Sequence, residues 1–176
     1  MLFCFNSGEV FQAAIKIEEN GLNFYTMAHK AVSDPEIAQL FASLADEEVG
    51  HRKYFESLLS EMPEELKRPT VSDPEQEIGM YIEALADQHV FGPGAKQADI
   101  PANLATVEDA LKLAIQFEKD SVVFYLGMQE ATCEGKAKDA VGLLVKEELA
   151  HVRRLSLHLR KCSADVMACT LNWSKA

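Results

Sequence analysis

Two stretches of this sequence repeat one another at an offset of 100 residues, and this repeat limits the possible folds more than any other feature. Residues 17–25 read Ile-Glu-Glu-Asn-Gly-Leu-Asn-Phe-Tyr, and residues 117–125 read Phe-Glu-Lys-Asp-Ser-Val-Val-Phe-Tyr. The string Glu-Glu-x-x-His ends at His51 in the first copy and at His151 in the second. A chain built from two copies of one unit is expected to fold with an internal two-fold axis.

Four long segments carry apolar residues at the spacing of one helix face, and no segment alternates with the period of a strand over a useful length. Proline, glycine and capping residues place these helices at about 7–31, 33–62, 106–131 and 136–162. The expected capping residues are Asn6, Ser33 and Thr106, with Pro35 in the first turn of the second helix. The sequence therefore predicts an all-α fold.

The spacing of the helices predicts how they are connected. Short connections make each of the pairs 7–62 and 106–162 antiparallel, and residues 63–105 are long enough to return along the whole bundle. We therefore expect one domain over residues 1–176: a four-helix bundle with one long crossover between its second and third helices, and a tail at 163–176.

Six ionisable residues interrupt the apolar stripes of these helices: Glu18, Glu48, His51, Glu118, Glu148 and His151. Glu and His three residues apart share one helix face, so all six are expected to point into one core. No lysine or arginine lies on these stripes near that level. Buried unpaired carboxylates are costly, and their crowding is expected to raise their pKa values. Two divalent cations would neutralise the four carboxylates, which indicates a paired metal site.

These residues and their spacing resemble the rubrerythrin and ferritin-like di-iron carboxylate family over about residues 7–162. The resemblance implies a ferritin-like bundle that binds two iron ions per chain, with manganese or zinc as alternatives. Glu18 and Glu118 would be terminal ligands, Glu48 and Glu148 bridging ligands, and His51 and His151 would each supply one metal with a nitrogen. Rubrerythrins carry a further Glu where this chain has Ser121, so the ligand set is closer to the symmetric bacterioferritin-like centres.

Two other repeated pairs lie near these candidate ligands. Tyr25 and Tyr125 lie seven residues beyond Glu18 and Glu118, and each hydroxyl is expected either to bond a ligand or to be satisfied elsewhere in the core. The pair Glu47 and Glu147 points about 100° away from the neighbouring glutamates, which predicts a solvated face or a helix contact. The repeat also predicts that His51 and His151 are equivalent.

The resemblance implies an oxidoreductase that acts on hydrogen peroxide or dioxygen, as a peroxidase or ferroxidase active in oxidative stress. Two alternatives use the same ligands: an iron-handling protein without turnover, and a structural metal site, such as zinc. The chain has neither a Cys-x-x-Cys iron site nor a Gly-rich dinucleotide fingerprint, so electrons are expected from an external donor protein.

Composition limits the partners and the compartment. The net charge of −11 argues against nucleic acid, and no apolar run is long enough for a membrane span. We expect a cytoplasmic homo-oligomer, with a dimer favoured. Its four cysteines are expected to be reduced thiols, and Cys162 and Cys169 to pack or stay free.

Overall fold

The computed structural model describes residues 7–64, 106–132 and 135–164, and these residues form four helices and no strand. The helices are α1 (Ser7–Ala31), α2 (Pro35–Glu61), α6 (Val107–Ala131) and α7 (Lys136–Ala164). Their bounds lie within two residues of those predicted from sequence. The prediction of an all-α four-helix bundle is confirmed.

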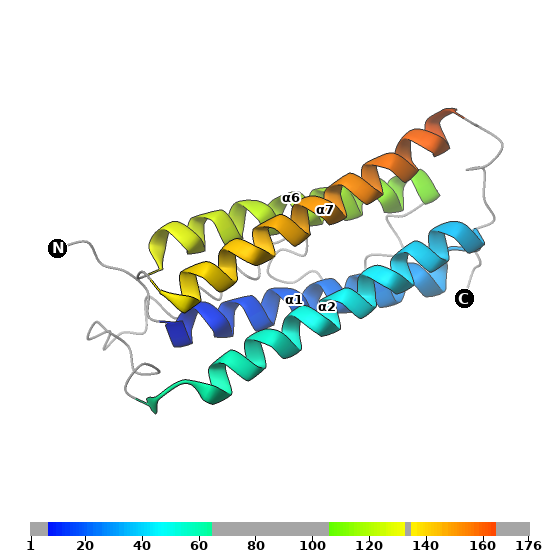
Figure 1. The fold of residues 1–176 in the computed structure, drawn as a ribbon. Coiled ribbons are helices and arrows are strands. Elements are labelled where there is room, and N and C mark those ends of the chain that lie inside the picture. Colours follow the sequence, from blue (N-terminus) through cyan, green and yellow to red (C-terminus); the bar gives the residue numbers. More distant parts are fainter. Residues whose placement is uncertain (1–6, 65–105, 133–134, 165–176) are drawn as a thin grey trace, which may run out of the picture.

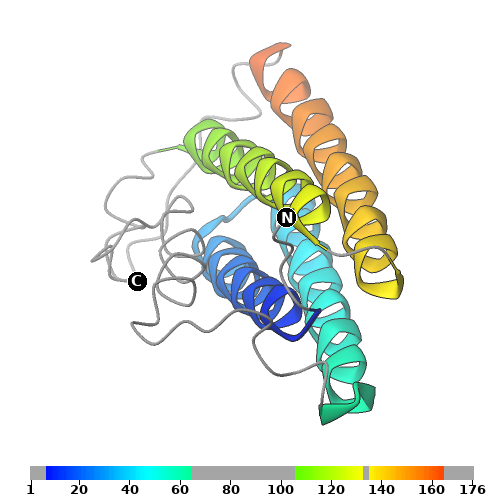
Figure 2. The ribbon, with the colours of Figure 1, turned by 90° about the vertical axis from the view of Figure 1, so that its left-hand side faces the viewer.

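The helices form two antiparallel pairs, α1 with α2 and α6 with α7, and each helix packs chiefly against the other member of its pair. Figure 1 shows the two pairs side by side, and Figure 2 shows the four helices around a shared interior. Helix α2 ends at one end of the bundle and α6 begins at the other, which is the arrangement that a long crossover requires (Figure 1). Residues 65–105 of that crossover and residues 165–176 of the tail lie outside the described residues.

The helix starts follow capping chemistry, with one correction. Asp34, and not Ser33, caps α2: its carboxylate accepts a hydrogen bond from the backbone N–H of Ile37 at 2.9 Å. Pro35 occupies the first helical position, so the residue directly before it is the one placed to cap. Thr106 caps α6 as predicted, accepting from the backbone N–H of Asp109 at 3.1 Å. The cap expected at Asn6 lies outside the described residues.

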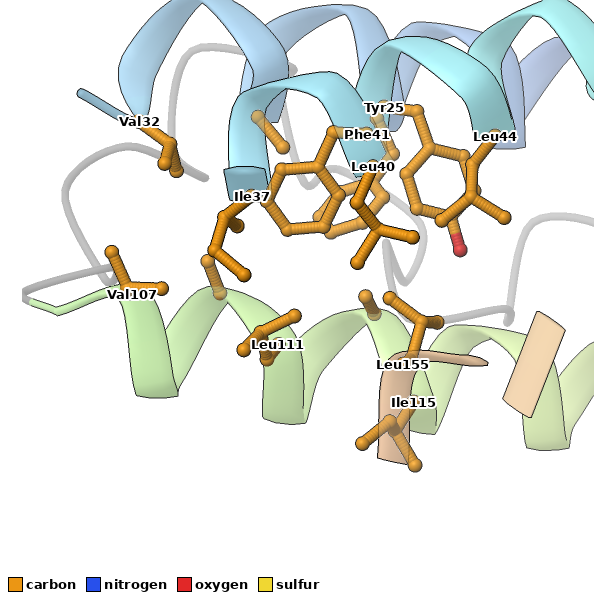
Figure 3. Close-up of a cluster of buried hydrophobic side chains, with 14 of the residues drawn as sticks. Tyr25, Val32, Ile37, Leu40, Phe41, Leu44, Val107, Leu111, Ile115 and Leu155 are labelled. Carbon is orange, nitrogen blue, oxygen red and sulfur yellow. The ribbon is translucent and has the colours of Figure 1, made fainter. Parts of the chain in front are cut away.

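Two apolar clusters fill the interior, one toward each end of the bundle. In Figure 3, residues of α2 such as Phe41 and Leu44 face residues of α6 and α7 such as Leu111 and Leu155. On every helix a buried glutamate falls between residues of the two clusters; these glutamates are Glu18, Glu48, Glu118 and Glu148. The bundle therefore holds a charged layer between two apolar layers.

One expectation about the cysteines is wrong. Cys162 packs in an apolar cluster near the end of α7, but it is disulfide-bonded and is not a reduced thiol. Cysteine pairing cannot be deduced from sequence spacing alone, and no spacing in this chain indicated the bond. Cys169 lies outside the described residues.

None of the described helices is long and apolar enough to cross a membrane.

Candidate metal centre

The six residues predicted from the repeat meet in the charged layer, and all four helices contribute. They form two overlapping groups in which the potential ligand atoms lie within 4.8 Å of one another. One group comprises Glu18, Glu48, His51 and Glu148; the other comprises Glu48, Glu118, Glu148 and His151. Because Glu48 and Glu148 belong to both groups, the geometry is that of two adjacent cation positions joined by two shared carboxylates.

Each histidine directs its Nδ1 atom toward this centre. His51 Nδ1 lies 3.0 Å from Glu18 Oε2, and His151 Nδ1 lies 3.1 Å from Glu118 Oε1. The two imidazole rings are stacked, with centroids 5.6 Å apart. Both Nδ1 atoms are thus positioned beside the carboxylates with which they would share a metal ion.

The outer ring nitrogens contact a second pair of glutamates, across the two helix pairs. His51 Nε2 lies 2.5 Å from Glu147 Oε2, and His151 Nε2 lies 3.2 Å from Glu47 Oε2. Of the two alternatives expected for Glu47 and Glu147, a solvated face or a helix contact, the helix contact is observed, but sequence reasoning missed that the contact is with the candidate ligands. Their repetition beside the Glu-x-x-His strings was the available signal. A carboxylate on the outer nitrogen fixes the orientation of the ring and its tautomer.

Tyr25 and Tyr125 also reach across the bundle. The Tyr25 hydroxyl donates to Glu118 Oε1, and the Tyr125 hydroxyl donates to Glu18 Oε1. Each tyrosine thus bonds the glutamate of the other repeat, and not the one seven residues before it. Of the two alternatives from sequence, the hydrogen bond to a candidate ligand is the one observed.

The carboxylates differ in their affinity for protons in the metal-free protein. Burial, together with the negative charge of neighbouring glutamates, raises the pKa values of Glu48 and Glu148 well above their usual range. Although burial lowers the pKa of His51, hydrogen bonds with Glu18 and Glu48 raise it to about 11.

Glu118 departs from the expectation that crowding raises the pKa of every carboxylate in the layer. Burial favours its protonated form, but hydrogen bonds from Glu148, His151 and Tyr25 and the charge of His151 outweigh burial and lower its pKa. The expectation is therefore wrong for this residue, because crowding alone ignores the donors that face it.

The chemistry of this donor set fits a pair of cations. Three carboxylate oxygens are buried without a hydrogen-bond partner in the described part of the chain: Glu48 Oε1, Glu118 Oε2 and Glu148 Oε2. An unsatisfied buried acceptor is destabilising, and a cation bound by these oxygens would remove that penalty. Carboxylate oxygens together with imidazole nitrogens are ligands that divalent iron, manganese and zinc accept.

A four-helix bundle with paired Glu and Glu-x-x-His donors between its helices defines the class of ferritin-like di-metal carboxylate proteins. The profile of the Rubrerythrin family matches residues 9–159, and the chain belongs to that family. Membership of this di-iron carboxylate family implies a di-metal site.

A solved structure has the same fold. It is the crystal structure of a protein from Thermotoga maritima assigned to the ferritin-like di-iron-carboxylate proteins. The two chains superpose with a TM-score of 0.61 and are 19% identical, over 91% of this chain and 98% of the other. No curated protein sequence matches this chain.

Proposed function

We propose that this protein binds two iron ions between its helices and is an oxidoreductase that acts on hydrogen peroxide or dioxygen. The observation that supports it is the sharing of Glu48 and Glu148 between two buried donor groups, each completed by one further glutamate and one histidine. When bound, a pair of ferrous ions would together supply the two electrons that reduction of one hydrogen peroxide to water consumes.

Each residue of the layer has a part in this proposal. Glu48 and Glu148 would bridge the two metal positions, Glu18 and Glu118 would each complete one position, and the Nδ1 atoms of the two histidines would provide the nitrogen ligands. Tyr25 and Tyr125 hold the terminal glutamates through hydrogen bonds from the opposite helix pair. The apolar clusters on both sides keep bulk water from the centre.

The first test is metal content. The apoprotein is reconstituted anaerobically with Fe(II), and bound iron is measured after unbound iron is removed. We expect two ions per chain in the parent and loss of both in the variant Glu48→Gln with Glu148→Gln, because each residue serves both positions. Glu19→Gln is the matched control, since Glu19 is an exposed neighbour of Glu18 and belongs to neither donor group. One ion per chain, unaffected by the double substitution, would contradict the paired site.

The second test is turnover. We expect the iron-loaded protein to consume hydrogen peroxide repeatedly with NADH and a separate redox protein, and to stop after one equivalent with NADH alone. Consumption of only one equivalent of hydrogen peroxide under both conditions would indicate an iron-handling protein and not an enzyme. Isolation with redox-silent zinc that Fe(II) does not displace would instead indicate a structural metal site.

A further inference from the structure

We infer that the two metal positions are unequal: the position that contains His151 binds its ion first and more tightly, because Arg154 holds Glu47 against His151. This inference rests on the proposed metal binding and goes beyond it, since the repeat by itself predicts two equivalent positions.

The surroundings of His151 are ordered by an arginine. Arg154 donates from both terminal nitrogens to Glu47, with distances of 2.8 Å to Oε1 and 2.6 Å to Oε2. The same Oε2 atom lies 3.2 Å from His151 Nε2. A guanidinium that grips both oxygens fixes the plane of a carboxylate more firmly than a single contact does. Arg154 therefore holds Glu47, Glu47 holds the imidazole, and the imidazole directs Nδ1 toward Glu118.

The surroundings of His51 lack this support. In the first copy of the repeat, the position that corresponds to Arg154 is Tyr54, which is 45% exposed. Glu147, the partner of His51, has a side chain that is 56% exposed, against 38% for Glu47. Within the described part of the chain, no arginine donates two hydrogen bonds to Glu147, as Arg154 does to Glu47. The His51 side chain is 11% exposed, whereas that of His151 is 2% exposed.

Order before binding raises affinity. A ligand that is already held in its binding orientation loses little side-chain freedom when the ion arrives, whereas a looser ligand must first be ordered. Loss of a residue that hydrogen-bonds a ligating histidine typically lowers metal affinity by about 10–100-fold. Because Arg154 acts through Glu47, we expect its effect near the lower limit of that range. The more exposed His51 position is then the one that fills second and exchanges its ion more readily.

The test is a titration of the full-length apoprotein with Co(II), whose visible absorption reports the ligands of each ion, supported by calorimetry. We expect two resolved steps in the parent. His151→Gln should remove the tighter step, and His51→Gln should remove the weaker one. Arg154→Tyr, which copies the residue of the other repeat, should weaken the tighter step about tenfold and leave the weaker step unchanged.

Two controls separate positioning from general damage. Lys161→Ala removes another basic residue of α7, whose ion pair with Glu36 lies away from the centre, and should change neither step. Arg154→Lys keeps the positive charge but cannot donate to both Glu47 oxygens from a planar group. The affinity of the tighter step in this variant should therefore lie between those of the parent and Arg154→Tyr. Melting temperatures of the apoproteins show whether any variant is simply unfolded.

The outcomes distinguish this inference from the proposed function. Two indistinguishable steps, tighter binding at the His51 position, or equal weakening of both steps by Arg154→Tyr would each overturn the inequality while leaving the paired site intact. Co(II) binding that is the same in the parent and in Glu48→Gln with Glu148→Gln would overturn the proposed site and the inference together.

Discussion

The absence of a side chain at Gly21 brings α1 close to a carboxylate of the candidate centre. A Cβ atom at this position would lie 3.0 Å from Glu48 Cδ and 3.2 Å from both of its carboxylate oxygens. Glycine inside a helix is less favourable than alanine by about 1 kcal/mol. Its place in α1 is therefore explained by the space that Glu48 occupies.

We predict that Gly21→Ala weakens metal binding while leaving the apoprotein at least as stable as the parent. The methyl group displaces the Glu48 carboxylate, which serves both positions, so affinity should fall on the order of tenfold for both ions. The measurement is a Co(II) titration together with thermal melting of the apoprotein.

Gly50→Ala is the matched control for this prediction. Gly50 is an exposed glycine of α2, and a Cβ there would meet nothing within 4 Å. It should gain the same helix propensity without any change in metal affinity. Parent-like binding by Gly21→Ala would show that the approach of Gly21 to Glu48 does not govern the site.

The sequence predicted which residues of the centre meet but not what each contacts. Helical period places Glu18 and Tyr25 on one face of their helix, yet it does not say which neighbouring helix faces them. The bond from Tyr25 to Glu118 therefore followed only from the packing of the two pairs. The repeat also predicted that His51 and His151 are equivalent. That prediction rested on the residues that the two copies share, and it left out Arg154, which the other copy replaces by Tyr54.

Among the elements, α2 shows how finely local signals determine a helix start. Ser33 and Asp34 are both residue types that cap helices, and the prediction of Ser33 as the cap was wrong. Pro35 and the hydrogen bond from Ile37 N to Asp34 place the cap at Asp34. The extent of the helix was predictable to within two residues because proline, glycine and capping residues mark its ends.

We predict that Asp34→Ala lowers the free energy of unfolding by about 1 kcal/mol, the usual consequence of losing a capping side chain. Asp34→Asn should retain most of the stability, because an asparagine side-chain oxygen accepts the same hydrogen bond. Chemical denaturation of the metal-free protein measures both changes. Equal losses in the two variants would show that the charge of Asp34, and not its cap, stabilises α2.

Across the whole molecule, the charged layer makes the bundle a compromise between folding and binding. In the metal-free protein, bound protons reduce the repulsion among the buried carboxylates and so reduce the free-energy cost of burying the layer. The pKa values of Glu48 and Glu148 are raised accordingly, and that of His51 is raised to about 11. Metal binding requires deprotonated carboxylates, so protons and metal ions compete for one set of atoms. The stabilisation that bound metal adds to the folded protein should therefore grow as pH rises.

We predict that the metal-free protein becomes less stable as pH rises. A group whose folded pKa is raised holds more protons when folded, so its contribution is complete below the unfolded pKa and is lost above it. That loss begins near the unfolded value of about 4.3 for Glu48 and Glu148, and runs from about 6.5 upward for His51. Glu118, with its lowered pKa, acts in the opposite sense, but its contribution is lost only as pH falls below its unfolded value.

Melting temperatures at several pH values, with chelator and with anaerobic Fe(II), test this prediction. The metal-free protein should melt at lower temperatures as pH rises, and the gain from metal should grow over the same range. Glu48→Gln with Glu148→Gln should flatten the metal-free trend and abolish the gain. Because a net charge of −11 also destabilises the chain at high pH, the control is Glu19→Gln with Glu130→Gln, which removes two exposed charges instead. If metal stabilises the core double variant as much as the parent, the stabilising ions bind outside the charged layer.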